Sequence, residues 1–177
     1  TVSFLGIVLL LYLIFYVPKF EYIKSRLTSF LDSETGTHNF QSDKAIESIV
    51  SGGFFGKGIG EGTLKNRVPE AHTDYIISVI SEEFGVIVIM LILTIFLTFI
   101  FLIFKRVNNE KDNKIKLILV GSGSLILIQT MIHVGVNIRL FPTTGMTLPF
   151  LSYGGSSILS ISILSGIILN LTKRKIS

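Results

Sequence analysis

Residues 84–104 read FGVIVIMLILTIFLTFIFLIF and contain no charged residue. A helix of roughly 20 apolar residues crosses the hydrocarbon core of a bilayer, so this stretch predicts a transmembrane helix. Shortly before it stands the segment Pro69-Glu70-Ala71-His72-Thr73-Asp74. Two carboxylates and an imidazole are therefore expected at or just inside a membrane interface. Ionisable groups there are costly unless they are used, so the segment is a candidate functional site.

The composition indicates a membrane protein with several spans. Hydrophobic residues make up 49% of the chain, the mean hydropathy is +0.66, and the apolar residues form long blocks. A soluble core would break them into periodic stripes. The net charge of +4 comes from basic residues beside the apolar blocks, which argues against a nucleic-acid partner. The absence of cysteine excludes disulfides and thiolate metal sites within the chain. Because Thr1 lies within an apolar run, we expect the chain to be a fragment of a longer protein.

The predicted fold is an all-α polytopic bundle in one integral membrane domain, residues 1–177. Spans are expected at residues 2–17, 76–104, 117–138 and 156–171. The short loop 105–116 is rich in lysine, and such loops stay cytoplasmic. Alternation then puts the outer loop 18–74 and the turn 139–155 outside, and the C-terminus inside.

The long outer loop contains two features of its own. Ser42–Val50 predicts a short amphipathic helix with Ser42 as its N-cap, lying on the outer leaflet or capping the bundle. The glycine-rich residues 51–62 do not have the spacing of a Walker A loop. Two alternatives stay open for them: backbone N–H groups that face an anionic head group, or a hinge with positive-φ turns.

The second outer segment, residues 139–155, combines apolar character with helix breakers. Its two prolines and its glycines forbid a continuous helix. Irregular backbone at membrane depth persists only where it is buried in protein or lines a wet cavity. We expect a re-entrant segment that lines a site, with a merely structural broken helix as the alternative. The candidate substrate-binding residues in it are Thr143, Thr144, Ser152, Tyr153, Gly154 and Gly155.

Several motifs, in order along the chain, together resemble the SEDS family of FtsW, RodA and SpoVE. They are Gly52–Gly58, Pro69–Asp74, Glu82–Gly85, Pro142–Gly145 and Leu151–Ser157. The resemblance is greatest to the FtsW branch and implies the last four of about ten spans. One departure is Thr144, because many members have a lysine at this position.

The resemblance implies an inverting peptidoglycan glycosyltransferase that polymerises lipid II during cell division. Asp74 matches the essential aspartate of the family and is the predicted general base. Glu70 and His72 are the other predicted catalytic residues, although Pro69 and Glu70 would also suit an ordinary helix start, and His72 a structural role. A helix beginning at Pro69 would put Glu70 one turn from Asp74, where the two carboxylates could share Mg²⁺ or Mn²⁺.

The outer-face cations available for a diphosphate are Lys57, Lys65, Arg67 and Arg139. Arg139 has no acidic neighbour in the sequence and is expected to be unpaired, as a phosphate ligand would be. Within the third span, Gln129 and His133 lie four residues apart. This spacing favours hydrogen bonds between helices over a proton relay.

The family implies a bacterial cytoplasmic (inner) membrane location with the active site on the extracytoplasmic face. The implied partners are lipid II, a class B penicillin-binding protein similar to FtsI, and other divisome proteins. Two alternatives are a lipid II flippase and a non-catalytic divisome scaffold. A transporter should hold its charges near the bilayer midplane, whereas Glu70, His72, Asp74 and Arg139 gather at the outer interface, which favours the enzyme.

Overall fold

The computed structural model describes residues 6, 21, 37–68 and 71–173. These residues form helices without strands, which confirms the predicted all-α class. The first predicted span, residues 2–17, lies outside the described residues apart from Gly6. The main helices are α3 (Thr37–Gly52), α4 (Leu64–Arg67), α5 (Ile76–Phe84), α6 (Val86–Asn109), α7 (Asn113–Asn137) and α8 (Gly155–Thr172).

Helices α6, α7 and α8 form the bundle, and each is long and apolar enough to cross a membrane. Their shared core contains Ile100, Ile103, Leu119, Ile126 and Ile161. The predicted inner loop 105–116 is much shorter in the structure, since α6 continues to Asn109 and α7 begins at Asn113. The lysines and arginines at both ends of the predicted loop are good helix formers, so they extend α6 and α7. Asp112 caps α7 by accepting a hydrogen bond from the Lys114 N–H.

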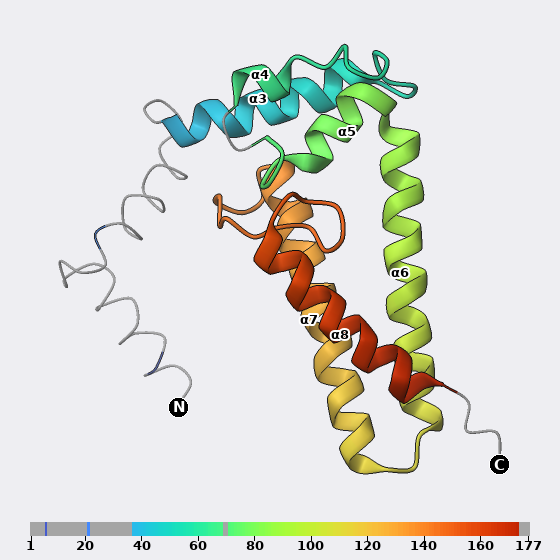
Figure 1. Ribbon diagram of the computed structural model, residues 1–177. Helices are drawn as coiled ribbons and strands as arrows, with labels where there is room; N and C mark the ends of the chain where they lie inside the picture. Colours follow the sequence, from blue (N-terminus) through green and yellow to red (C-terminus); the bar gives the residue numbers. More distant parts are fainter. Residues whose placement is uncertain (1–5, 7–20, 22–36, 69–70, 174–177) are drawn as a thin grey trace.

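Helices α3, α4 and α5 lie across the other end of the bundle and form a cap (Figure 1). The predicted helix Ser42–Val50 is present, but it begins at Thr37, so Ser42 is inside α3 and is not its N-cap. The Ser42 hydroxyl instead lies 3.3 Å from the Tyr75 hydroxyl. A polar side chain that resembled a helix start therefore serves a contact with the segment before α5.

The predicted span 76–104 is wrong as a single helix, because Gly85 divides it into α5 and α6 with a φ of 83°. The glycine-rich loop packs against this corner. Its Lys57 and Gly58 N–H groups donate to the Glu82 and Glu83 carbonyls at 2.9 and 3.0 Å. A Cβ on Gly85 would lie 2.1 Å from the Phe54 carbonyl oxygen. Only glycine permits both the positive φ and this close approach.

The same loop resolves the two alternatives for residues 51–62. Gly53, Gly56, Gly58 and Gly60 have positive φ, as predicted for turns. The loop is nevertheless fixed against α5 and does not form a free hinge. The N–H groups of Lys57 and Gly58 are used internally, so they do not face an anionic head group.

Replacing Gly85 by alanine should destabilise the corner by about 1–3 kcal/mol, because the side chain adds backbone strain and meets the Phe54 carbonyl. Thermal unfolding of the purified protein in detergent measures this loss. Gly121→Ala in α7 is the matched control, since nothing lies within 4 Å of its added Cβ. Equal stability of both variants would contradict the packing described for the corner.

Candidate functional site

Residues 71–75, here the Asp74 turn, directly precede α5. Three successive carbonyls of this turn accept hydrogen bonds from other segments. The His72 carbonyl accepts from the Tyr153 N–H at 3.1 Å. The Thr73 carbonyl accepts from Ser152 Oγ at 2.7 Å and from His133 Nε2 at 3.2 Å. The Asp74 carbonyl accepts from Asn137 Nδ2 at 2.9 Å. Protein donors thus satisfy the backbone carbonyls of this irregular turn.

Asn137 also supplies the missing cap of α5. The N-cap residue Tyr75 makes no side-chain capping bond. Asn137 Oδ1 instead accepts from the Ser78 N–H at 3.1 Å and from Ser78 Oγ at 2.8 Å. The Ser78 N–H is the third of the helix, the group that a local N-cap side chain would bind. One buried amide therefore fixes both the Asp74 carbonyl and the first turn of α5.

Gln129, His133 and Asn137 follow one another at intervals of four residues on one face of α7. Gln129 Nε2 donates to the Thr147 carbonyl at 2.8 Å. The predicted hydrogen bonds of Gln129 and His133 are present, but they do not join helices, because both acceptors are carbonyls of non-helical segments, Thr147 and Thr73. Asn137 was missed from the sequence. The signal for it was the continuation of the same four-residue spacing by one more turn.

The segment between α7 and α8 is irregular, and the predicted break by proline and glycine is confirmed. Leu148 and Pro149 are buried, and the Leu148 N–H donates to Ser152 Oγ at 2.8 Å. Ser152 thus joins this segment to the Asp74 turn through Thr73. Thr147 and Ser157 are hydrogen-bonded through their hydroxyls and attach the segment to α8.

A cavity of about 450 Å³ lies between the Asp74 turn and this segment. Its lining residues are His72, Ile76, Phe150, Leu151, Ser152, Tyr153 and Ile158. Of the substrate-binding residues predicted in the segment, Ser152 and Tyr153 line the cavity, and Thr143, Thr144, Gly154 and Gly155 do not. Asp74 is buried, and its neighbours His72 and Ile76 border the cavity.

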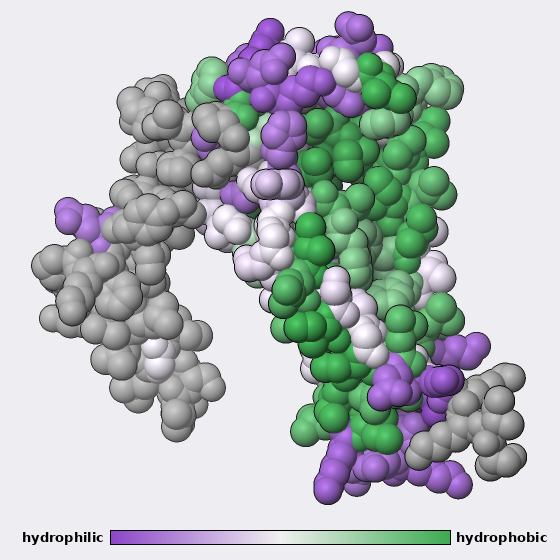
Figure 2. Space-filling view, in the orientation of Figure 1, coloured by the Kyte–Doolittle hydropathy of each residue, from purple (hydrophilic) through white to green (hydrophobic). Residues whose placement is uncertain are grey.

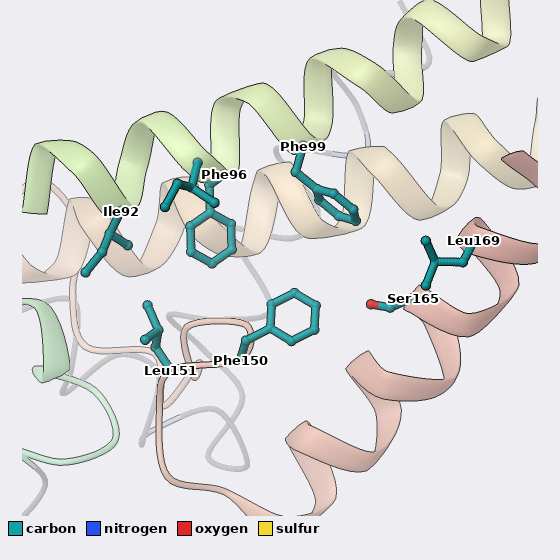
Figure 3. Close-up of a pocket in the computed structure, with 8 residues that line it drawn as sticks. Ile92, Phe96, Phe99, Phe150, Leu151, Ser165 and Leu169 are labelled. Carbon is teal, nitrogen blue, oxygen red and sulfur yellow. The ribbon is translucent and has the colours of Figure 1, made fainter.

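A second cavity of about 380 Å³ lies between α6 and α8 (Figure 3). It is apolar apart from Ser165, and the side chains of Phe96 and Phe99 approach it from α6. Phe150 and Leu151 line both cavities. The two cavities are therefore neighbours that share these two residues, with polar groups near the turn and an apolar lining between the membrane helices.

Most of the predicted diphosphate ligands take part in ion pairs. Lys57 pairs with Glu82 at 2.9 Å and Lys65 with Glu83 at 3.0 Å. The prediction that Arg139 is unpaired is wrong, because α3 brings Asp43 to its guanidinium. The two residues are far apart in sequence, so spacing along the chain could not reveal the pair. Arg67 lines a separate polar cavity of about 170 Å³ in the cap.

Glu82 is a buried carboxylate that caps α4 from a distance. Its oxygens accept from the Leu64 N–H at 3.0 Å, from the N–H and hydroxyl of Thr63, and from Lys57. Burial raises the pKa of this carboxyl, but the hydrogen bonds from Leu64, Lys57 and Thr63 outweigh burial and lower the pKa to about 2. Glu82 therefore stays ionised and holds the cap together.

The predicted pairing of Glu70 with Asp74 is not supported in its helical form. Pro69 and Glu70 lie outside the described residues, while residues 71–75 form a turn and α5 begins only at Ile76. The described part of the chain contains no group of three or more His, Cys, Asp or Glu residues that could hold a metal ion. The divalent cation therefore stays a prediction.

The chain is similar in sequence to the members of one protein family. A family model described as "Cell cycle protein", covering FtsW, RodA and SpoVE, matches residues 1–176. The probable peptidoglycan glycosyltransferase FtsW of Enterococcus hirae is 40% identical over 97% of this chain and 44% of its own length. Stage V sporulation protein E of Bacillus subtilis is 36% identical over 96% of this chain and 47% of its own.

A solved structure agrees with these relatives. One chain of a peptidoglycan synthase complex that coordinates polymerization and crosslinking has a TM-score of 0.65 and 26% identity to this chain. The match covers 94% of this chain and 47% of the other. The chain thus spans about half the length of the proteins it matches.

Acid should destabilise the cap through Glu82. Its pKa is about 2 in the folded protein and 4.5 ordinarily, so its stabilisation is complete above pH 4.5 and is lost as the pH falls toward 2. Ionised Glu82 thus contributes about 3 kcal/mol to the free energy of unfolding. Thermal unfolding between pH 7 and pH 2 should show this loss, and Glu82→Gln should remove it while lowering stability at pH 7. Glu61→Gln, at an exposed position of the glycine-rich loop 51–62, should behave like the unchanged protein. An unchanged acid profile in Glu82→Gln would contradict the assignment.

Proposed function

The chain belongs to the cell cycle protein family of FtsW, RodA and SpoVE, and on that premise we propose that it is part of a peptidoglycan glycosyltransferase. The proposed reaction is the polymerisation of lipid II into glycan strands during septal wall synthesis. Relatives named as probable peptidoglycan glycosyltransferases support this assignment.

The observation that carries the proposal is the immobilised Asp74 turn beside a cavity. A general base must be held in a fixed place relative to the hydroxyl whose proton it takes. Hydrogen bonds to the carbonyls of His72, Thr73 and Asp74 fix the backbone on both sides of the Asp74 side chain. His72 and Ile76, two residues before and after Asp74, line the cavity, where an acceptor sugar would bind.

Asp74 is the proposed general base. Its carboxylate takes the proton of the acceptor hydroxyl while the oxygen forms a bond to the anomeric carbon of the donor. The bond from that carbon to the diphosphate breaks on the opposite side, and the configuration is inverted. The diphosphate leaves as an anion and needs positive charge. Of the four predicted cations, Arg67 alone has no ion pair among the described residues, but it lines the separate cavity of the cap and not the cavity beside His72.

The neighbouring position of the two cavities suits a lipid-linked substrate. The polar space beside His72 and Tyr153 fits a head group, and the apolar space between α6 and α8 fits a hydrocarbon chain. Phe150 and Leu151 lie between these two spaces and contribute to the lining of both. A flippase would also need such surfaces. The α7 side chains that a proton-coupled transporter could use, Gln129 and His133, are engaged with backbone carbonyls, so no observation favours transport.

The proposed site lies on the extracytoplasmic face of the bacterial inner membrane, with a cytoplasmic C-terminus. The lysines and arginines at the adjoining ends of α6 and α7 support this orientation, because such residues mark cytoplasmic ends. The proposed partners are a class B penicillin-binding protein and other divisome proteins, and the similarity to a chain of a peptidoglycan synthase complex supports the former.

A cysteine at Asn66 should react with an impermeant maleimide in intact spheroplasts, and one at Asn109 only after permeabilisation. The reverse pattern would overturn the orientation.

Asp74→Asn in the full-length protein with its penicillin-binding partner should lower the rate of glycan polymerisation by about 10²–10⁴-fold, as loss of a general base does. The amide is nearly isosteric but cannot take the proton. Gel analysis of the glycan products from purified lipid II measures the rate. Asp112→Asn, which keeps a good N-cap for α7, is the matched control and should retain activity.

Two outcomes would count against this account. Near-normal polymerisation by the Asp74→Asn variant would remove Asp74 from the chemistry. Transport of lipid II across vesicles by the unchanged complex, with no glycan product, would favour the flippase.

A further inference from the structure

We propose that residues 53–59, here the corner loop, form an anchor whose Phe54, Phe55 and Ile59 side chains enter the outer half of the bilayer. The ligand of this surface is the acyl region of membrane lipids. The inference depends only on α6 being a membrane span and is independent of glycosyl transfer.

The corner loop is an apolar exception on the cap. Phe54, Phe55 and Ile59 are 73%, 84% and 80% exposed. Most of the surface of the cap is hydrophilic, but apolar surface reaches its edge above α6 (Figure 2). Large apolar side chains grouped on one exposed loop mark an interaction surface.

Hydrogen bonds fix the depth of the corner loop in the membrane. The Gly53 carbonyl accepts from the Val86 N–H at 2.9 Å, and the Phe54 carbonyl lies 3.5 Å from the Ile87 nitrogen. These are the first N–H groups of α6, whose N-cap Gly85 has no side chain to bind them. The uncharged stretch begins at this end of α6, at the boundary of the hydrocarbon region. The corner loop therefore lies at that boundary.

The apolar surface of the corner loop is continuous with the exposed face of α6. Ile87, Met90 and Leu91, in the first turns of the helix, are exposed. In a membrane span such side chains meet lipid. A segment bonded to the start of that helix meets the same lipid, which identifies the occupant as the bilayer. Phenylalanine is also among the side chains that interfacial segments bury at the boundary of headgroups and acyl chains.

The corner loop is held so that its apolar side chains stay outward. The Lys57 side chain pairs with the Glu82 carboxylate, and the Lys57 N–H donates to the Glu82 carbonyl. A Cβ on Gly56 would lie 2.2 Å from the Glu83 carbonyl oxygen, which shows how closely the backbone lies on α5. Because α5 leads from this corner to the Asp74 turn, the anchor also sets the height of that turn over the membrane.

The test is a spin-label depth measurement on the full-length protein in vesicles of phosphatidylethanolamine and phosphatidylglycerol. The chain has no cysteine, so single cysteines at Phe54 and Phe55 can be labelled with a nitroxide. Both sites are exposed and tolerate the label. Power saturation then compares the access of oxygen, which concentrates in lipid, with that of a water-soluble nickel chelate. Labels at Glu61 and Asn66, exposed polar positions of the cap, are the controls.

The proposal predicts that oxygen reaches the labels at 54 and 55 better than nickel does, with the reverse at 61 and 66. Preferential access of nickel at 54 and 55 would mean that the loop faces water and would overturn the proposal. Low access of both reagents would mean that protein covers the loop, and would also overturn it.

Discussion

The first N–H groups of a helix have no partners within that helix, and near a membrane boundary water is a poor substitute for them. Two helices of the cap and the first helix of the bundle meet this constraint with groups from other segments. Glu82 binds the start of α4, Asn137 binds the start of α5, and the carbonyls of Gly53 and Phe54 lie against the start of α6. Each of these contacts also joins two parts of the fold, so the capping of the helices and the assembly of this end of the fold are the same interactions.

The candidate site follows from this arrangement. The Asp74 turn leaves regular structure just before α5, and its carbonyls need donors as the helix starts need acceptors. Asn137 meets both needs with one amide, and Ser152 and His133 serve the carbonyl of Thr73. The segment before α8 thereby comes to lie against the turn, and the cavity lined by His72 and Tyr153 is formed between them. The corner at Gly85 fixes the far end of α5.

The sequence predicted the features that depend on local composition. The apolar blocks revealed the spans of α6, α7 and α8, and prolines and glycines revealed the irregular segment before α8. The motif with Asp74 and the resemblance to a known family identified the candidate site. Contacts between remote residues could not be predicted. Asp43 reaches Arg139 only because α3 packs against α7, and Glu82 reaches Thr63 and Leu64 only because α4 packs against α5. The break at Gly85 was missed because a glycine within an apolar run is compatible with a continuous helix.

The central claim is that Asn137 holds the Asp74 turn and the start of α5, and amide hydrogen exchange in an Asn137→Ala variant tests it most directly. Removing the amide leaves the Ser78 N–H and the Asp74 carbonyl without this partner. The account predicts faster exchange at Ser78 and a lower rate of polymerisation with little change in KM. Asn170→Ala, at an exposed position of α8, should change neither. Unchanged exchange at Ser78 together with full activity in the Asn137→Ala variant would contradict the account.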